Sequence, residues 1–340
     1  MSKRVTVEQV AAHAGVSTST VRNVVSGRAE VVSPATRARV EAAIDELGYS
    51  PVRRVMSRRF LEETFIGFEI ARPGDAPNPI FTSTLLELNT AARDSNCRLI
   101  AFTTSQEPER LSDYRQVWQS GLIEGFIFSD PHFQDDRITY LREAGIPFVV
   151  IGRSEREDDY CWTDVDDRRG IVMAVNHLVD KGHDHIGLVS WAGPIDKRSA
   201  TGDPVAQRRG SGYKDALLAH GLEIMTADGT TYRESAVENC MELLRRTPRP
   251  TAIVATCDEF ASDALEAART LDLEVPHDLA IVGFDDSVIA RRAHPRLTSV
   301  RQPIAEVARA AISLLLQVRK DRSFHGSRLI EPELVVRESS

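Results

Sequence analysis

Short β-rich runs that alternate with amphipathic segments fill the chain between residues 65 and 286. The runs are FIGFEI (65–70), CRLIAFTT (97–104), GFIFSD (125–130), PFVVIG (147–152), HIGLVS (185–190), TAIVAT (251–256) and LAIVGFDD (279–286). Segments with helical periodicity lie between them, for example at 80–96 and 170–183. Strands that alternate with helices predict parallel sheets in a doubly wound α/β arrangement. Seven runs favour two similar lobes over a single one.

Polar residues end several of these runs. They read Ser-Asp at 129–130, Gly-Arg at 152–153, Cys-Asp at 257–258 and Phe-Asp-Asp at 284–286. In doubly wound sheets, ligands bind beyond the carboxyl ends of the strands. The sequence therefore predicts a polar ligand site where these ends meet.

The first fifty residues contain three short helical segments instead. Capping residues precede the segments and glycines follow them: Thr6, Ser17 and Ser33 come before, and Gly15, Gly27 and Gly48 come after. Thr6 together with Gln9 fits a capping box. Two short helices joined by a tight, Gly-containing turn and supported by a third predict an all-α helix-turn-helix head.

The head is basic, and the rest of the chain is acidic. Residues 1–60 contain ten Lys or Arg and five Asp or Glu, a net charge of +5. Because the whole chain carries −8, the remaining residues carry −13. This asymmetry favours a polyanionic partner for the head, with a merely solvated charged face as the alternative.

One face of the second helical segment is polar and contains no carboxylate. It carries Thr18, Ser19, Arg22 and Asn23. Arg suits guanine and Asn suits adenine through paired hydrogen bonds, so this face fits the major groove of DNA. Residues at the helix N-termini are expected to contact phosphates. They are Thr6, Ser17, Ser33 and Thr36.

The head resembles the DNA-binding head of the lactose/galactose repressor (LacI/GalR) family. The likeness lies in TVEQVAAHAGVSTSTV (6–21) and VSPATRARVEAAIDELGYSP (32–51). It implies a homodimer on a near-palindromic operator, with Thr18, Ser19 and Asn23 at base-reading positions. The family usually has Ser-Arg where this chain has Arg22 and Asn23, so a family operator cannot simply be transferred.

The segment PVRRVMSRRFLEE (51–63) resembles the family's hinge, which we place at 51–62. In the family this hinge forms a helix in the minor groove, where a Leu wedge opens a base step. Arg58 stands at the wedge position and could enter a narrow minor groove electrostatically. Met56 or Phe60 could act as wedges instead, and a flexible basic linker is the alternative.

The body resembles the family's effector domain, which is related to periplasmic sugar-binding proteins. The matching stretches are NPIF (78–81), GIPFVVIGR (145–153), DVDDRRG (164–170), HLVDKGHDHIGLV (177–189), RRGSGY (208–213), IVGFDD (281–286), LTSVRQP (297–303) and ELVVRES (333–339). The likeness implies a head at 1–50 and an effector-binding and dimerisation domain at 63–340. Its first lobe would take about 63–162 and 292–322, and its second about 163–291 and 323–340.

The resemblance also implies effector-binding residues. Arg209, Asp285 and Gln302 stand where family members hold polar groups of the effector. Tyr232 matches loosely an aromatic position that packs on the sugar, and Phe81 follows the Asn-Pro turn that lines the cleft. Carboxylates, Arg and Gln satisfy sugar hydroxyls, and an aromatic ring covers an apolar sugar face.

Three positions depart from the family pattern or allow two interpretations. Cys257 stands where an Asn is usual, which removes one expected hydrogen bond to the ligand, and Asp167 likewise replaces an Asn. Arg153 either favours a larger or more polar ligand or pairs with Asp166 across the cleft. Because release of DNA by ligand is the commoner family behaviour, we expect a repressor controlled by a small sugar or glycoside.

The sequence does not indicate enzyme, metal or cofactor chemistry. It contains no G-x-G-x-x-G, P-loop, H-E-x-x-H or G-x-S-x-G pattern. Four scattered cysteines, no long apolar run and no signal peptide predict a reduced, cytoplasmic protein without a membrane segment. The alternatives are a stand-alone sugar-binding protein, against which the head counts, and an enzyme on the same fold.

Overall fold

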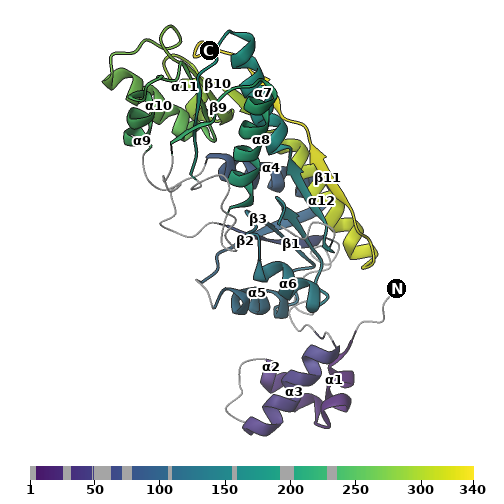
Figure 1. Cartoon of the computed structure of the whole chain (residues 1–340). Helices are drawn as coiled ribbons and strands as arrows, with labels where there is room; N and C mark the ends of the chain where they lie inside the picture. The colour runs from purple at the N-terminus through teal and green to yellow at the C-terminus, as the bar shows by residue number, and fades with distance from the viewer. Residues whose placement is uncertain are drawn as a thin grey trace.

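The structure of the 340-residue chain is a computed structural model. It describes residues 5–25, 32–47, 49, 63–70, 79–105, 109–154, 159–191, 203–227 and 236–340. Figure 1 shows a small helical head near the N-terminus and an elongated body of two lobes, with the C-terminus in the second lobe. The expected hinge with Arg58 and the expected aromatic contact of Tyr232 lie outside the described residues.

Three helices form the head, as predicted. They are α1 (Val7–Ala14), α2 (Thr18–Val25) and α3 (Pro34–Leu47). Thr6 and Gln9 form the expected capping box before α1, and Gly15 ends α1 with a left-handed φ of 64°. The apolar stripes of the helices meet in a separate small core, in which Val10, Val21 and Val40 are fully buried.

The first lobe is a sheet of six parallel strands in the order β11-β5-β4-β3-β1-β2. The strands are β1 (Thr64–Glu69), β2 (Cys97–Phe102), β3 (Phe126–Ser129), β4 (Phe148–Ile151), β5 (Trp162–Val165) and β11 (Ser327–Ile330). The helices are α4 (Pro79–Asp94), α5 (Arg110–Gln119), α6 (Asp136–Glu143) and α12 (Ile304–Lys320). Ile127 of β3 packs with α4 and α12, whereas Phe128 packs with α5 and α6. Burial on both faces explains the continuous apolar runs in the sequence.

The second lobe repeats this plan with a sheet in the order β12-β10-β9-β8-β6-β7. Its strands are β6 (Ile186–Val189), β7 (Met225–Ala227), β8 (Ala252–Ala255), β9 (Ala280–Asp285), β10 (Thr298–Arg301) and β12 (Glu333–Val335). Its helices are α7 (Asp167–Asp180), α8 (Pro204–Ala219), α9 (Val237–Leu244), α10 (Asp258–Thr270) and the short α11 (Val288–Arg292). Strand β12 pairs antiparallel with β10, and the other pairs are parallel. Val254 of β8 faces α7 and α8, and Ile253 faces α9 and α10. The predicted doubly wound α/β body with two lobes is therefore confirmed.

The chain passes between the sheets after β5, after β10 and between β11 and β12. These crossovers differ from the lobe boundaries expected from the sequence. Strand β10 lies within the segment 292–322 that was expected in the first lobe, but it pairs with β9 of the second sheet. Strand β11 lies within the segment 323–340 that was expected in the second lobe, but it pairs with β5 of the first. Each of these strands has four residues, too few for a sequence pattern to show which sheet it joins.

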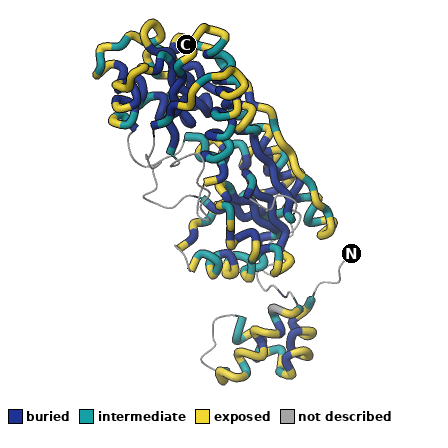
Figure 2. Tube along the Cα trace, viewed as in Figure 1, coloured by how far each residue is buried: buried dark blue, intermediate teal, exposed yellow. Residues whose placement is uncertain are grey.

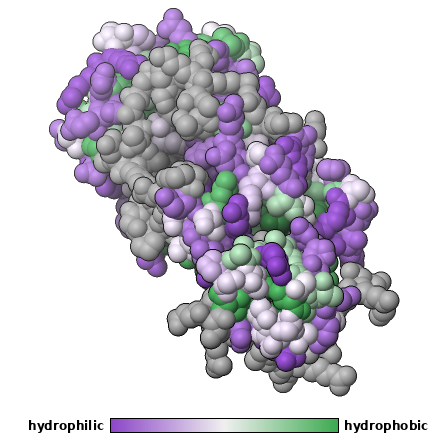
Figure 3. Space-filling model, turned by 90° about the horizontal axis from the view of Figure 1, so that it is seen from below, coloured by the Kyte–Doolittle hydropathy of each residue, from purple (hydrophilic) through white to green (hydrophobic). Residues whose placement is uncertain are grey.

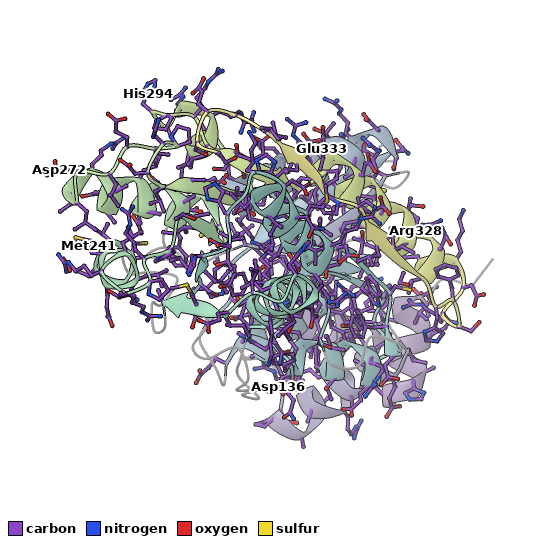
Figure 4. The ribbon with its side chains drawn as sticks, turned by 45° about the horizontal axis from the view of Figure 1, so that its top comes forward. Asp136, Met241, Asp272, His294, Arg328 and Glu333 are labelled. Atoms are coloured by element: carbon purple, nitrogen blue, oxygen red, sulfur yellow. The ribbon has the colours of Figure 1, made fainter. Side chains whose placement is uncertain are left out.

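Figure 4 shows β11 and β12, which carry Arg328 and Glu333, as neighbouring parts of one segment that runs from the first lobe to the second. Figure 2 shows a buried interior in each lobe, with exposed residues mainly on the outer helices. The strand ends between the two interiors form the place where both lobes present polar side chains.

Candidate functional site

A cavity of about 320 Å³ lies between the lobes, at the carboxyl ends of strands from both sheets. The first lobe contributes Phe81 of α4 and Asp130, which follows β3. The second lobe contributes Arg209 of α8 and Asp285 of β9. Gln302 follows β10 at the second crossover and completes the wall. The cavity lies where the polar strand ends predicted a ligand site.

The structure brings together most of the residues expected to bind an effector. Those that line the cavity are Phe81, Arg209, Cys257, Asp285 and Gln302. Arg153 is not among its lining residues. The binding roles of these residues stay predictions.

Arg209 is the buried cation of the cavity, with 4 % of its surface exposed. Its Nε donates to Asp167 Oδ1 at 2.8 Å, and one Nη donates to the Thr256 carbonyl at 2.5 Å. Burial opposes its charge, but Asp167 and Asp285 raise the pKa of Arg209 above its ordinary value. The guanidinium also lies 3.7 Å from the centre of the Phe284 ring. Arg209 is therefore a fixed donor at the floor of the cavity.

Asp285 faces Arg209 and has an unusual backbone. Its φ is 113°, a region that favours glycine, and this strain persists only where the surroundings enforce it. Gln302 donates to Asp285 Oδ1 at 2.6 Å, and Arg209 lies 3.6 Å from the same oxygen. Burial raises the pKa of Asp285 well above its usual range, against the opposing effect of Arg209. A buried carboxylate with a shifted pKa, on a strained backbone and lining a cavity, is typical of a functional site.

Two aromatic side chains line the cavity on opposite lobes. Phe81 of the first lobe stacks on Phe68, with ring centres 5.8 Å apart. Trp191 of the second lobe donates its indole N–H to Asp203 at 2.7 Å and lies 5.6 Å from the Arg209 guanidinium. The sequence reasoning missed Trp191, although it closely follows the run at 185–190, where the strand-end rule places ligand contacts.

Arg153 and Cys257 were both expected to contact the ligand, but only Cys257 lines the cavity. The Arg153 Nε donates to Asp164 Oδ2 at 2.9 Å, and its guanidinium lies 5.2 Å from the Trp162 ring. Arg153 thus pairs with Asp164 and not with Asp166, the expected alternative, whose side chain caps α7 by accepting from the Arg169 amide. Cys257 reaches the cavity beside the N-terminus of α10, and burial raises the pKa of its thiol well above the usual range. It therefore presents a weakly polar, un-ionised surface to a ligand.

A buried network supports the first-lobe wall, centred on Glu69 at the end of β1. Its carboxylate accepts from Thr104 at 2.6 Å, Tyr114 at 2.8 Å, Arg137 at 2.6 Å and both Nε and Nη of Arg110 at 2.9 Å. Burial acts to raise the pKa of Glu69, but Arg137 and Arg110 lower it to about 2. Arg137 also donates to the carbonyl of Asp130 at 3.1 Å. The network thereby fixes the backbone that presents Asp130 to the cavity.

The head presents the second polar surface that the sequence predicted. In α2, Ser19 and Arg22 are exposed, Thr18 and Asn23 are half-buried, and Val21 on the opposite face is fully buried. At the N-termini, Ser17 accepts from the Thr20 amide at 3.2 Å and Ser33 from the Thr36 amide at 3.3 Å.

Arg39 of α3 was not singled out from the sequence. It donates to the carbonyls of Ala14 at 3.0 Å and Gly15 at 3.2 Å. These bonds tie α3 to the turn between α1 and α2 and fix the angle at which α2 is presented.

The described surface in Figure 3 is mainly hydrophilic, with smaller hydrophobic areas between. Within the described ranges, no helix is both long and apolar enough to cross a membrane. In the same part of the chain, no three His, Cys, Asp or Glu side chains are grouped so that they could hold a metal ion.

Comparison with known proteins matches both parts of the chain. Residues 6–52 match the family model for bacterial regulatory proteins of the lacI family, and residues 175–340 match a periplasmic binding protein-like domain. The transcriptional regulator CelR of Thermobifida fusca is 33 % identical, over 99 % of this chain and 98 % of its own. The ribose operon repressor of Haemophilus influenzae is 29 % identical, over 98 % of each chain.

Two solved structures match the chain almost end to end. The CelR–cellobiose complex superposes with a TM-score of 0.70 and 31 % identity, over 99 % of this chain and 100 % of the other. The lac repressor dimer bound to operator and the anti-inducer ONPF superposes with a TM-score of 0.70 and 25 % identity, over 99 % of each chain.

A helix-turn-helix head joined to a two-lobed body with a polar interlobe cavity defines a ligand-responsive class of DNA-binding protein. The head match and the full-length relatives make the assignment specific. The chain belongs to the LacI family of bacterial regulatory proteins and is a DNA-binding transcriptional regulator. The alternative of a stand-alone binding protein is thereby set aside.

Proposed function

We propose that this regulator is a repressor whose affinity for its operator is controlled by a small sugar or glycoside bound between the lobes. The observation that carries the proposal is the cavity, where Asp285 accepts a hydrogen bond from Gln302 and forms an ion pair with Arg209. A relative is named for a ribose operon, and another was solved with cellobiose. These names support a sugar as the ligand class.

The chemistry of the cavity suits a polyhydroxylated ligand. Gln302 and Arg209 donate hydrogen bonds, and the carboxylate of Asp285 accepts them, so adjacent hydroxyls can each find a partner. Phe81 and Trp191 offer apolar surface for the C–H faces of a sugar ring. Cys257 stands where an Asn would supply a hydrogen-bond donor. We therefore expect the ligand to present no hydroxyl group that needs a donor at that point.

The head is proposed to read the operator through α2. Thr18, Ser19, Arg22 and Asn23 would face the bases, whereas Thr6, Ser17, Ser33, Thr36 and Arg58 would contact the DNA backbone or minor groove. A homodimer is proposed because a two-fold protein matches a near-palindromic site, as in the lac repressor dimer on its operator. Such a protein works in the cytoplasm, where its DNA is, and needs no catalytic activity.

A thermal-shift screen tests the ligand class. The full chain is melted with cellobiose, ribose and a panel of other mono- and disaccharides, and the Gln302→Ala variant is measured beside it. A sugar that binds the folded chain raises the melting temperature, and at a hundredfold excess over Kd it adds about 2.7 kcal/mol to stability. Asp215→Ala is the control, since Asp215 pairs with Arg168 on the surface.

The proposal predicts that one sugar stabilises the wild type and the control but not Gln302→Ala. If Gln302→Ala responds like the control, the cavity assignment is wrong, and if no sugar in the panel raises the melting temperature, the proposed ligand class is wrong. Repeating the screen with nucleobases and amino acids would then identify a different ligand class.

A further inference from the structure

A row of alternating charges runs beside the cavity from one lobe to the other. Arg153 Nε donates to Asp164 Oδ2 at 2.9 Å, and Arg208 Nη2 donates to the same oxygen at 3.2 Å. The Arg208 Nε donates to Asp167 Oδ2 at 3.3 Å, and Arg209 Nε donates to Asp167 Oδ1 at 2.8 Å. Each carboxylate is therefore shared by two guanidinium groups.

Arg208 is the member of this row that joins the lobes. It lies in α8, which packs on the second sheet, and it immediately precedes Arg209 in the sequence. Two of its three acceptors belong to the first lobe: Asp164 of β5 and the carbonyl of Arg153 after β4, at 3.1 Å. The third, Asp167, begins α7 just beyond the first crossover. The Arg208 bonds therefore join residues on the two sides of the first crossover.

The row is largely shielded from water, so solvent competes little with its hydrogen bonds. The side chains of Arg208, Asp164 and Asp167 are 18 %, 10 % and 3 % exposed. Burial and the neighbouring Asp167 raise the pKa of Asp164 to about 6, while Arg208 and Arg153 act to lower it. Without Arg208, two buried carboxylates would lie close together with one guanidinium fewer between them.

We propose that Arg208 is a latch between the lobes, and that its bonds to Asp164 and the Arg153 carbonyl hold the arrangement described here. Opening the cavity requires these bonds to break, because their acceptors and their donor lie on opposite sides of the first crossover. Asp167 accepts hydrogen bonds from both Arg208 and the cavity residue Arg209. A ligand that hydrogen-bonds to Arg209 therefore affects the latch through the shared carboxylate of Asp167. The latch does not depend on which ligand binds.

Distances between the lobes test the latch in the full chain without any ligand. Nitroxide labels are attached at Thr139→Cys in α6 and Glu266→Cys in α10, both exposed positions on different lobes. The native cysteines, Cys97, Cys161, Cys240 and Cys257, are buried, so labelling is selective. Pulsed electron–electron double resonance is recorded on labelled chain diluted with unlabelled chain, so that distances within one chain are measured.

The proposal predicts one dominant distance in the otherwise wild-type chain and a longer, broader distribution with Arg208→Gln. Loss of a charge-assisted hydrogen bond corresponds to a rise of roughly tenfold or more in the ratio of open to closed chains. Arg168→Gln is the matched control. Arg168 of α7 also donates two hydrogen bonds to a carboxylate, that of Asp215 in α8, at 2.8 and 3.0 Å, but both helices belong to the second lobe. The distribution of Arg168→Gln should match that of the wild type.

Arg208→Lys is a second variant that keeps the test possible if Arg208→Gln does not fold. It keeps the positive charge beside both carboxylates but cannot reach three acceptors at once, so it should give an intermediate distribution. Circular dichroism verifies that each measured variant is folded. An unchanged distribution in folded Arg208→Gln or Arg208→Lys overturns the latch, and so does an equal change in Arg168→Gln. These outcomes are independent of the sugar screen.

Discussion

Replacing Glu69 by Gln should reveal how strongly the buried network stabilises the cavity wall. Glu69→Gln keeps the shape and removes the charge that Arg110 and Arg137 share. The pKa of Glu69 falls from 4.5 to about 2 in the folded chain. At about 1.36 kcal/mol per pKa unit, ionised Glu69 contributes about 3 kcal/mol to the free energy of unfolding at neutral pH. We expect the variant to lose about that amount.

The pH dependence has a definite sign. Because the pKa of Glu69 is lower in the folded chain than in the unfolded chain, its contribution is complete above about pH 4.5. It is lost progressively as the pH falls toward about 2. The difference in stability between wild type and Glu69→Gln should therefore be constant near neutral pH and shrink on acidification. Urea unfolding followed by circular dichroism, from neutral pH downward, measures both quantities.

Glu63→Gln provides the control within the same lobe. Glu63 also receives two hydrogen bonds from one arginine, Arg98, at 3.0 and 2.7 Å, but the Arg98 side chain is 50 % exposed. Exposed pairs of this kind contribute at most about 1 kcal/mol. If Glu69→Gln costs no more than Glu63→Gln, or if its cost does not change on acidification, the reasoning about the buried network is refuted.

Three further outcomes are expected. Asn23→Ala should weaken operator binding by about 1–3 kcal/mol and relax the preference at one base pair, and an unchanged preference in a binding-site selection would contradict this. Arg39→Met should destabilise the head by about 1–2 kcal/mol, since two hydrogen bonds to the turn are lost, as thermal melting of the full chain would show. Asp164→Asn should gain stability relative to wild type as the pH rises toward about 6, because the raised pKa makes ionised Asp164 costly in the folded chain. A pH series of urea unfolding curves in which this difference stays constant would refute the last point.

Periodicity and caps predicted the regular parts of the fold. The seven apolar runs correspond to β1, β2, β3, β4, β6, β8 and β9, and the capping residues placed all three helices of the head. Strands such as β10 and β11 were misplaced because sheet membership depends on long-range pairing. A four-residue strand such as Thr298–Arg301 carries no local signal of which neighbour it will join.

The cavity was predicted in part, for a physical reason. Arg209 and Asp285 were expected from motifs, and both line the cavity. Asp130 belongs to the polar strand ends from which the ligand site was predicted, and it lines the cavity. Trp191 was missed, because the prediction considered only polar residues at the strand ends. Arg153 was expected either to favour a larger or more polar ligand or to pair with Asp166, yet it donates to Asp164, eleven residues away in the sequence. Pairings of this kind become visible only when strands are placed side by side.

The central claim is that a ligand in the cavity controls the head. It is tested by the affinity of the full chain for its selected operator, measured by fluorescence anisotropy with and without the sugar found in the screen. Coupling between the two sites of about 1–3 kcal/mol would change the operator affinity roughly 5–150-fold. We predict such a change for the wild type and for Asp215→Ala, and none for Asp285→Ala, which should still bind operator without sugar. A sugar response in Asp285→Ala equal to that of the wild type would contradict the account.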